Sequence, residues 1–364
     1  MKIKTITCHD VYNHGALLQA FALQQYLEDL RHLVEIINYK PDYLSQHFSF
    51  RAVSNPKFDK PIIKCLYLLA KLPSRLCALP RKKAFDKFRN KYLNITSIRY
   101  NSNEELKNNL PIADAYICGS DQIWNSFFRN GKDPAFYLDF VPDEKLKISY
   151  APSFATECID ESLEPFVKEN IKRLNTISVR ETSGLNILRK MGIENAVQVM
   201  DPVFLLSAKF WEQSFVEPIN EDYIFVYDFD SHPLVEHIAK KMAAKFNCKI
   251  ITVNKNITYS DKNYWKKGPE FFISLMSNAK FVVSNSFHAT AFSLIFEKQF
   301  CVVSRTEAIN TRMTDLLGLF NLQNRIINKK TDLEQLPNIN YSKINPLIEE
   351  ESERSKLFLK NALS

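Results

Sequence analysis

FVVSNSFHATAFSLIF, residues 281–296, is the stretch in which a predicted strand leads directly into a predicted helix. Residues 281–283 form an apolar run typical of a buried strand, residues 284–286 interrupt it, and residues 289–296 resemble a helix. The N-terminus of a helix presents free N–H groups and a positive dipole end, which favour an anion. His288 lies at this junction and can titrate near neutral pH. The stretch therefore predicts a site where an anion is bound and a proton is moved.

The same alternation of strand and helix extends outward along the chain. Strands are predicted at 2–8, 33–38, 113–118, 147–150, 176–179, 196–199, and then at 223–227, 249–253, 280–283 and 300–303. Helices are predicted at 16–30, 104–109, 163–174, 183–191, 234–246, 269–278, 289–296 and 311–319. Alternating strands and helices predict parallel sheets covered on both faces. Two such series predict an α/β protein with two Rossmann-like domains that face a central cleft.

The length of 364 residues also favours about two domains. We place the N-terminal domain at 1–210 and the C-terminal domain at 211–328. The tail, 329–364, is polar and then forms a charged helix that could return to the first domain.

Composition excludes several classes of site. With only 7 glycines, the chain contains neither GxGxxG nor GxxxxGK[ST], so a glycine-rich phosphate loop is not expected. The 7 cysteines include no CxxC pair and indicate buried thiols in a reducing cytoplasm. The start of the chain does not resemble a signal peptide, and no stretch has the roughly 18 apolar residues of a membrane-spanning helix. We therefore expect a cytoplasmic protein, with peripheral contact at the inner membrane face as an open question.

The positive charge is concentrated in one segment. Residues 56–95 contain eleven Lys or Arg and two Asp, a formal charge of +9, whereas the whole chain carries +7. The segment is also leucine-rich, which is typical of helices that lie on an anionic membrane. The alternative is a pair of ordinary helices with a solvated basic face, because Pro73 and Pro80 argue against one continuous helix. No nucleic-acid partner is expected, since the segment lacks a recognised fold or aromatic platform.

Six motifs that occur in order resemble the polysaccharide pyruvyl transferase family. They are NHGALLQA at 13–20, GSDQIWN at 119–125, SYAPSFA at 149–155, ISVRE at 177–181, DPVFLL at 201–206 and SNSFHATAFSLIF at 284–296. The resemblance implies a GT-B-like fold and transfer from phosphoenolpyruvate to a pair of sugar hydroxyls, giving a pyruvate ketal and phosphate. It implies no metal or cofactor. The implied acceptor is a capsular or exopolysaccharide precursor, with galactose as the leading candidate and a polyprenyl-diphosphate-linked sugar as one form.

The resemblance also implies a donor site. His288 matches the family's histidine and is the expected general acid and base, the alternative being a histidine that caps a helix or lies in the core. The family has an arginine two residues earlier, where this chain has Ser286. Arg312 is a candidate replacement, or else a surface residue at a helix start. Arg180 matches the family's S-x-R-E arginine, the alternative being a structural pair with Glu181. The expected donor-binding residues are Arg180, Arg312, Ser284, Ser286 and Thr290.

The acceptor site is expected at the loop that follows a predicted strand, residues 119–125. Gly119 permits a tight turn, the polar side chains suit sugar hydroxyls, and Trp124 offers a face on which a sugar ring could stack. The alternative is that Asp121 caps a helix and Trp124 is core. His14 could be a second acid or base, although a polar turn residue is favoured. The expected acceptor-binding residues are Asn13, Gly15, Gly119, Ser120, Asp121, Gln122, Trp124 and Asn125.

Two other functions remain open from the sequence. A GT-B glycosyltransferase that uses a nucleotide-sugar would have the same fold, although no nucleotide signature is present. A non-catalytic family member that binds a polysaccharide or a partner enzyme is also open, because the arginine expected at position 286 is absent.

Overall fold

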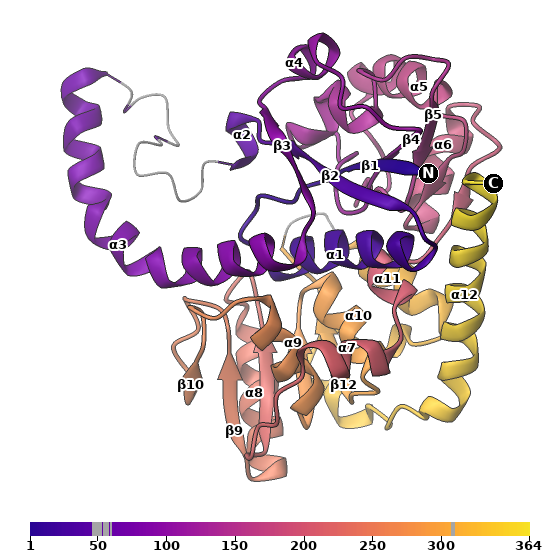
Figure 1. The fold of residues 1–364 in the computed structure, drawn as a ribbon. Helices are drawn as coiled ribbons and strands as arrows, with labels where there is room; N and C mark the ends of the chain where they lie inside the picture. Colours follow the sequence, from indigo (N-terminus) through magenta and orange to yellow (C-terminus); the bar gives the residue numbers. More distant parts are fainter. Residues whose placement is uncertain (46–52, 54–57, 59, 307–309) are drawn as a thin grey trace.

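The computed structural model describes residues 1–45, 53, 58, 60–306 and 310–364, which form two α/β domains (Figure 1). All strand pairs in the two main sheets are parallel. The first sheet has the order β3-β2-β1-β4-β5, with β1 (Lys2–Ile6), β2 (Leu33–Tyr39), β3 (Ile95–Tyr100), β4 (Ala115–Cys118) and β5 (Leu146–Ser149). The second has the order β10-β9-β8-β11-β12-β13, with β8 (Tyr223–Tyr227), β9 (Lys249–Thr252), β10 (Lys262–Asn263), β11 (Phe281–Ser284), β12 (Phe300–Val303) and β13 (Ile326–Ile327). The predicted α/β class with parallel sheets is confirmed.

A pair of short parallel strands extends the first domain. Strands β6 (Ser178–Val179) and β7 (Val197–Gln198) pair with each other, and Ile148 of β5 forms a parallel bridge with Thr176 just before β6. The helices are α1 (His14–Asp29), α2 (Asp42–Ser45), α3 (Pro61–Tyr92), α4 (Asn103–Asn108), α5 (Glu164–Lys172), α6 (Thr182–Lys190), α7 (Ala208–Phe215), α8 (Pro233–Phe246), α9 (Pro269–Asn278), α10 (Phe287–Ile295), α11 (Thr311–Leu319) and α12 (Tyr341–Ala362).

Helix α1 is buried on nearly every face because it lies between the two domains. It contacts β2 of the first sheet and α9 of the second domain. Phe21 of α1 packs against Trp211 and Phe215 of α7, with ring centroids 5.8 and 5.4 Å apart. A helix that is apolar all round is expected in such an environment. The N-terminus of α1 is therefore held at the domain boundary, which positions it for the site described below.

The basic segment differs from the prediction of two separate helices. It forms one helix, α3, that contains both Pro73 and Pro80. In Figure 1 this helix bends where its projecting half meets the half that lies against the body. Proline removes one backbone hydrogen bond and crowds the preceding turn, so bending is the expected response. The second half is anchored by the buried side chains of Phe85 and Phe88, which explains why the helix continues past the prolines.

Helix α12 connects the two domains. At its start, the hydroxyl of Tyr341 donates to the carbonyl of Ser293 in the C-terminal domain at 3.2 Å. Further along, the hydroxyl of Ser355 accepts a hydrogen bond from the Met200 amide at 2.8 Å, and Phe358 packs near Tyr150 of the N-terminal domain. Within the described residues, no helix is both long and apolar enough to span a membrane.

Candidate functional site

Charged side chains from both domains meet where the carboxyl ends of the two parallel sheets face each other. Asp121 follows β4, Arg180 follows β6 and Asp201 follows β7 in the first domain. His288 lies in the first turn of α10 after β11, and Arg312 lies in the first turn of α11 after β12. Ligands of open parallel sheets bind at this edge. These five side chains are referred to below as the central cluster.

Arg180 is the most strongly held member of the central cluster. Its Nη1 donates to Asp201 Oδ2 at 2.6 Å, and its Cζ lies 4.3 Å from the centroid of the Phe287 ring. Burial opposes the positive charge, but Asp201, Glu181 and Asp121 outweigh it and raise the pKa of Arg180. Its Nε and Nη2 are buried and have no hydrogen-bond partner among the described residues.

The positive charge of Arg312 is less well compensated by acidic neighbours than that of Arg180. Its Nη1 is 4.0 Å from Asp121 Oδ1, and the amide oxygen of Gln122 accepts from Nη2 and Nη1 at 2.9 and 3.0 Å when that amide is oriented to satisfy both. Its Nε is buried and, within the described part of the chain, unpartnered. Burial, reinforced by the charge of Arg180, lowers the pKa of Arg312 to about 10. A bound anion would relieve this unfavourable charge.

His288 completes the cluster from the C-terminal domain. Its Nε2 lies 3.8 Å from Asp201 Oδ2, and no described residue forms a hydrogen bond with it. Burial lowers the pKa of His288 even though Asp201 and Asp121 favour the charged ring. The imidazole is therefore neutral near pH 7 in the free protein and available as a base.

Gly15 is needed for this arrangement because His288 packs directly against α1. A Cβ atom added to Gly15 would lie 2.0 Å from His288 Nδ1, which no real structure tolerates. The role of Gly15 is therefore to let the histidine approach. Asn13 is also occupied, since its Oδ1 accepts from the Gly15 and Ala16 amides at 2.9 and 3.3 Å and so caps α1.

Asp201 and Phe287 were not assigned roles from the sequence, and Glu181 was considered only as a structural partner of Arg180, whose Nε lies 3.7 Å from Glu181 Oε2. Asp201 Oδ1 accepts from the Val203 amide and Oδ2 from Arg180, so one carboxylate both caps a turn and fixes the arginine. Burial raises the pKa of Glu181, and the hydroxyl of Ser153 donates to it at 2.6 Å. The motif DPVFLL, which directly follows a predicted strand, was the available signal for Asp201.

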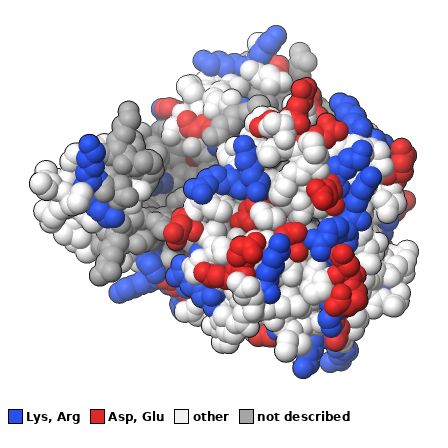
Figure 2. Space-filling view, turned by 90° about the horizontal axis from the view of Figure 1, so that it is seen from above, with Lys and Arg blue, Asp and Glu red and all other residues white. Residues whose placement is uncertain are grey.

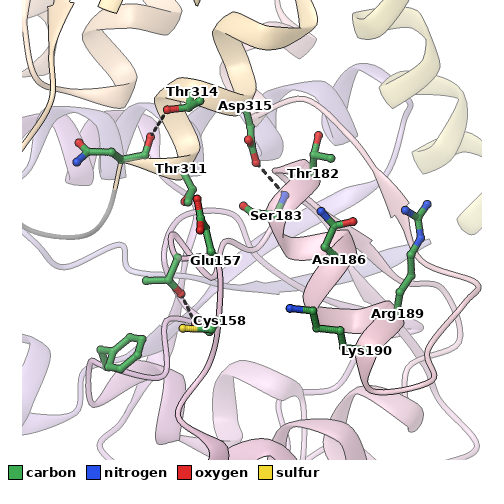
Figure 3. Close-up of a pocket in the computed structure, with 13 residues that line it drawn as sticks. Glu157, Cys158, Thr182, Ser183, Asn186, Arg189, Lys190, Thr311, Thr314 and Asp315 are labelled. Carbon is green, nitrogen blue, oxygen red and sulfur yellow. Dashed lines mark hydrogen bonds between the residues drawn. The ribbon is translucent and has the colours of Figure 1, made fainter. Parts of the chain in front are cut away.

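One pocket is lined by Asp121 of the central cluster, and a second is lined by Thr311, the neighbour of Arg312. One, of about 850 Å³, is lined by Asn13, Asp121 and Gln122, together with Tyr43 and Arg129; we call it the N-terminal pocket. The other, of about 940 Å³, lies between α6 and α11 and is shown in Figure 3. There the Ser183 amide donates to Asp315 Oδ2 at 2.8 Å and so connects the two domains.

The loop 119–125 fulfils only part of its prediction. Gly119 has φ of 121°, and a Cβ there would lie 2.0 Å from the Tyr150 carbonyl, so the tight turn is confirmed. Trp124 is fully buried, stacks on Tyr137 and donates from Nε1 to the Phe136 carbonyl. The prediction that it stacks on a sugar is therefore wrong, and the core alternative is correct.

Several other predicted ligands have their polar groups engaged within the protein. The hydroxyls of Ser284 and Thr290 donate to the carbonyls of Tyr227 and Ser286, at 2.5 and 3.0 Å. The hydroxyl of Ser120 donates to the Ala151 carbonyl at 2.7 Å. Asn125 is fully buried. Ser286 differs from these residues, because it directly precedes α10 and its side chain forms no capping hydrogen bond with that helix.

His14 is neither the second acid nor the polar turn residue that the sequence suggested. It is fully buried, stacks on Phe272 of the second domain at 5.0 Å and lies 4.7 Å from Phe85. Neither ring nitrogen has a partner among the described residues. Burial lowers its pKa well below the ordinary value. Its environment is that of a core aromatic residue.

Two buried histidines, His14 and His9, predict that the fold loses stability in acid. A histidine whose folded pKa is lowered stabilises the fold above its ordinary pKa of 6.5 and loses this contribution as the pH falls. Burial lowers the pKa of His9 to about 4. Between pH 7.5 and 5.5, this residue alone therefore lowers the free energy of unfolding by about 1 kcal/mol. His14→Phe is expected to unfold at a higher urea concentration, because it removes two buried ring nitrogens without partners among the described residues. It is also expected to lose less stability than the wild type between these two pH values, because burial lowers the pKa of His14. Urea titrations at both pH values check this, and an equal pH response in both proteins would contradict it.

Comparison with known proteins supports the fold and shows the family. The structure is similar to UDP-N-acetylglucosamine 2-epimerase from Rickettsia bellii, with a TM-score of 0.50 and 12% identity over 100% of this chain and 96% of that chain. It also resembles the Neisseria meningitidis UDP-GlcNAc 2-epimerase bound to UDP-GlcNAc (TM-score 0.45, 10% identity, 100% and 94% covered) and the E. coli heptosyltransferase with ADP (0.42, 12%, 96% and 100%). The fold is thus GT-B-like, as predicted. No curated protein sequence matches. The family model of polysaccharide pyruvyl transferase matches residues 13–307, and the chain belongs to that family.

Proposed function

We propose that the protein transfers a pyruvyl group from phosphoenolpyruvate to two hydroxyls of a saccharide, forming a ketal and releasing phosphate. One observation carries the proposal: Arg180 Nε and Nη2, Arg312 Nε and His288 Nε2 are buried without hydrogen-bond partners among the described residues. Buried unpartnered donors are costly, and a ligand with several anionic oxygens would satisfy them. Phosphoenolpyruvate provides such oxygens on both its carboxylate and its phosphate.

The proposed chemistry needs a group that first gives and then takes a proton. A proton is added to the vinyl carbon of phosphoenolpyruvate, which becomes the methyl group. The two sugar hydroxyls then form bonds to the adjacent carbon and lose their protons, while its bond to the phosphate oxygen breaks. One of the two protons returns to the acid and the other leaves with phosphate. His288 is the titratable group proposed for this exchange.

The electrostatics of the cluster suit this cycle. In the free protein, burial lowers the pKa of His288. An anionic donor beside the ring favours its protonated form and so raises that pKa. Binding of the donor would thus load the acid that the first step requires, and departure of phosphate would restore the neutral base. Arg180 and Arg312 supply the positive charge, so we also propose that no metal is needed.

We propose that the saccharide binds in the N-terminal pocket. Asn13, Asp121 and Gln122 of the expected acceptor set line it, and the exposed ring of Phe128 offers the stacking face that Trp124 does not. A galactose of a capsular or exopolysaccharide precursor remains the leading candidate. This proposal keeps the predicted division of the chain into two domains and a tail. It places the acceptor in the first domain and the donor mainly in the second.

The direct test is to incubate the protein with phosphoenolpyruvate and a panel of free and lipid-linked galactosides, measuring phosphate release and product mass. Acceptor-dependent phosphate release and a ketal-bearing product are expected. A parallel thermal-shift series compares phosphoenolpyruvate with UDP-sugars. Stabilisation by UDP-sugars alone would favour a glycosyltransferase, and stabilisation by the saccharide alone would favour a non-catalytic binding protein.

Arg312→Gln is expected to weaken phosphoenolpyruvate binding by about ten- to a hundredfold, because a charge-assisted hydrogen bond contributes roughly 1.5–3 kcal/mol. Isothermal titration with phosphoenolpyruvate measures this. The matched control is Arg189→Gln, since Arg189 is an exposed arginine on the pocket of Figure 3 and lies outside the central cluster. Unchanged affinity in Arg312→Gln would remove this residue from the donor site.

A further inference from the structure

The first half of α3, together with Phe58 just before it, carries an unusual concentration of exposed apolar side chains. Of the sixteen large hydrophobic side chains that are exposed among the described residues, seven lie between positions 58 and 76. They are Phe58, Ile62, Ile63, Leu66, Leu69, Leu72 and Leu76. Single exposed apolar residues are ordinary, but a contiguous group marks an interaction surface. We call residues 60–80, which are the N-cap and the first part of this helix, the arm; its outer part stands away from the body in Figure 1.

The arm is amphipathic. Ile62, Leu66, Leu69 and Leu76 are separated by four, three and seven positions, which places them along one face of a helix. Lys60, Lys64, Lys71 and Arg75 follow a similar spacing, and at 3.6 residues per turn they lie on the opposite face. An apolar face opposite a lysine- and arginine-rich face is typical of helices that lie in a membrane interface.

The charge of this region has a single sign. Residues 60–85 contain seven Lys or Arg and neither Asp nor Glu. At the left of Figure 2, the projecting part of the molecule shows basic side chains among uncharged ones. Closer to the body the situation differs, because Arg89 and Lys82 form ion pairs with Asp10 and Asp86.

We propose that the arm binds the surface of an anionic lipid bilayer. Its apolar face would enter the boundary between headgroups and acyl chains, and its basic side chains would contact lipid phosphates. Charge complementarity selects this occupant over a second copy of the chain. A symmetric pairing of two arms would bring two segments of the same positive charge together, which opposes association.

The base of the arm is attached to the wall of the N-terminal pocket. Arg81 Nη2 donates to the carbonyl of Tyr12 at 3.1 Å, and the Tyr12 hydroxyl donates to Asp86 Oδ1 at 3.2 Å. Tyr12 itself lines the pocket. A bilayer-bound arm would hold this pocket close to the membrane, where a lipid-linked saccharide is presented. This last consequence rests on the proposed function, whereas the membrane contact does not.

Co-sedimentation with vesicles tests the proposal, using the full chain and vesicles of phosphatidylcholine with or without phosphatidylglycerol. Binding is expected only with the anionic lipid and is expected to weaken as salt screens the charges. Leu66→Ser combined with Leu69→Ser, and Lys60→Glu combined with Lys71→Glu, should each reduce binding by about tenfold or more. These side chains are exposed or lie at the helix start, so far-UV circular dichroism and thermal midpoints should not change.

The matched controls place the same substitutions elsewhere. Leu33→Ser with Ile112→Ser removes two apolar side chains that are more exposed than Leu66 and Leu69, and Lys172→Glu with Lys209→Glu reverses two exposed charges. Both controls should bind like the wild type. Equal loss in the controls and the arm variants would overturn the proposal, as would binding that is independent of lipid charge. A dimer that dissociates in the arm variants, with no vesicle binding by the wild type, would instead assign the arm to a second copy.

Discussion

Replacing His288 by glutamine is expected to lower kcat for pyruvyl transfer by about a hundred- to ten-thousandfold, the usual contribution of a general acid or base. The amide of glutamine can still form a hydrogen bond from this position but cannot exchange a proton near neutral pH. Phosphoenolpyruvate should therefore still bind through Arg180 and Arg312, and the effect should appear in kcat more than in KM. Phosphate release under saturating donor and acceptor measures the loss.

The pH profile separates a catalytic His288 from a structural one. Burial lowers the pKa of this histidine in the free protein, so the limb of the kcat/KM profile that reports on it should lie below pH 6.5. That limb should disappear in His288→Gln. A variant that retains both the limb and the rate would sink the assignment of His288 as the acid and base.

The sequence was informative where strands are buried on both faces. β4, β8, β11 and β12 have every residue buried, so they are continuous apolar runs and were predicted. The edge strand β3 was missed, because it has three consecutive exposed positions and no apolar alternation. The other missed strands, β10 and β13, have only two residues each, too few for a pattern.

Site residues that follow a strand could be predicted from their position in the chain alone. Arg180 and His288 were found because parallel strands bring their carboxyl ends to one edge, and Arg312 because it starts the helix after β12. Contacts between residues far apart in sequence could not be read in this way. Trp124 and His14 are polar-capable side chains in loops or helix starts, yet each is enclosed by aromatic residues from other elements. Phe287 was not recognised because its place in the site depends on contacts with Arg180 and Arg312, which are far away in the sequence. Their Cζ atoms lie 4.3 and 5.9 Å from the centroid of its ring.

Gly15→Ala is expected to cost both stability and activity, although alanine normally favours a helix by about 0.5–1 kcal/mol over glycine. The new methyl group would lie 2.0 Å from His288 Nδ1, so the ring or the whole of α1 must move. Overpacking of this kind costs about 1–3 kcal/mol. A displacement of about 1 Å at a catalytic group can cost on the order of a hundredfold in rate. Urea titration and kcat measure the two effects.

Gly318→Ala in α11 is the matched control, because its added methyl would meet only the Gln323 side chain, at 3.6 Å. Gly318→Ala should gain the helix preference of alanine, about 0.5–1 kcal/mol, and keep its activity. If the contact with His288 is the cause, the double variant Gly15→Ala/His288→Ala should be more stable than the two single effects predict, by about 0.5–3 kcal/mol. Additive effects would mean that the methyl group disturbs α1 independently of the histidine. A positive coupling would show that α1 of the first domain and the His288 side chain of the second share one tightly filled space.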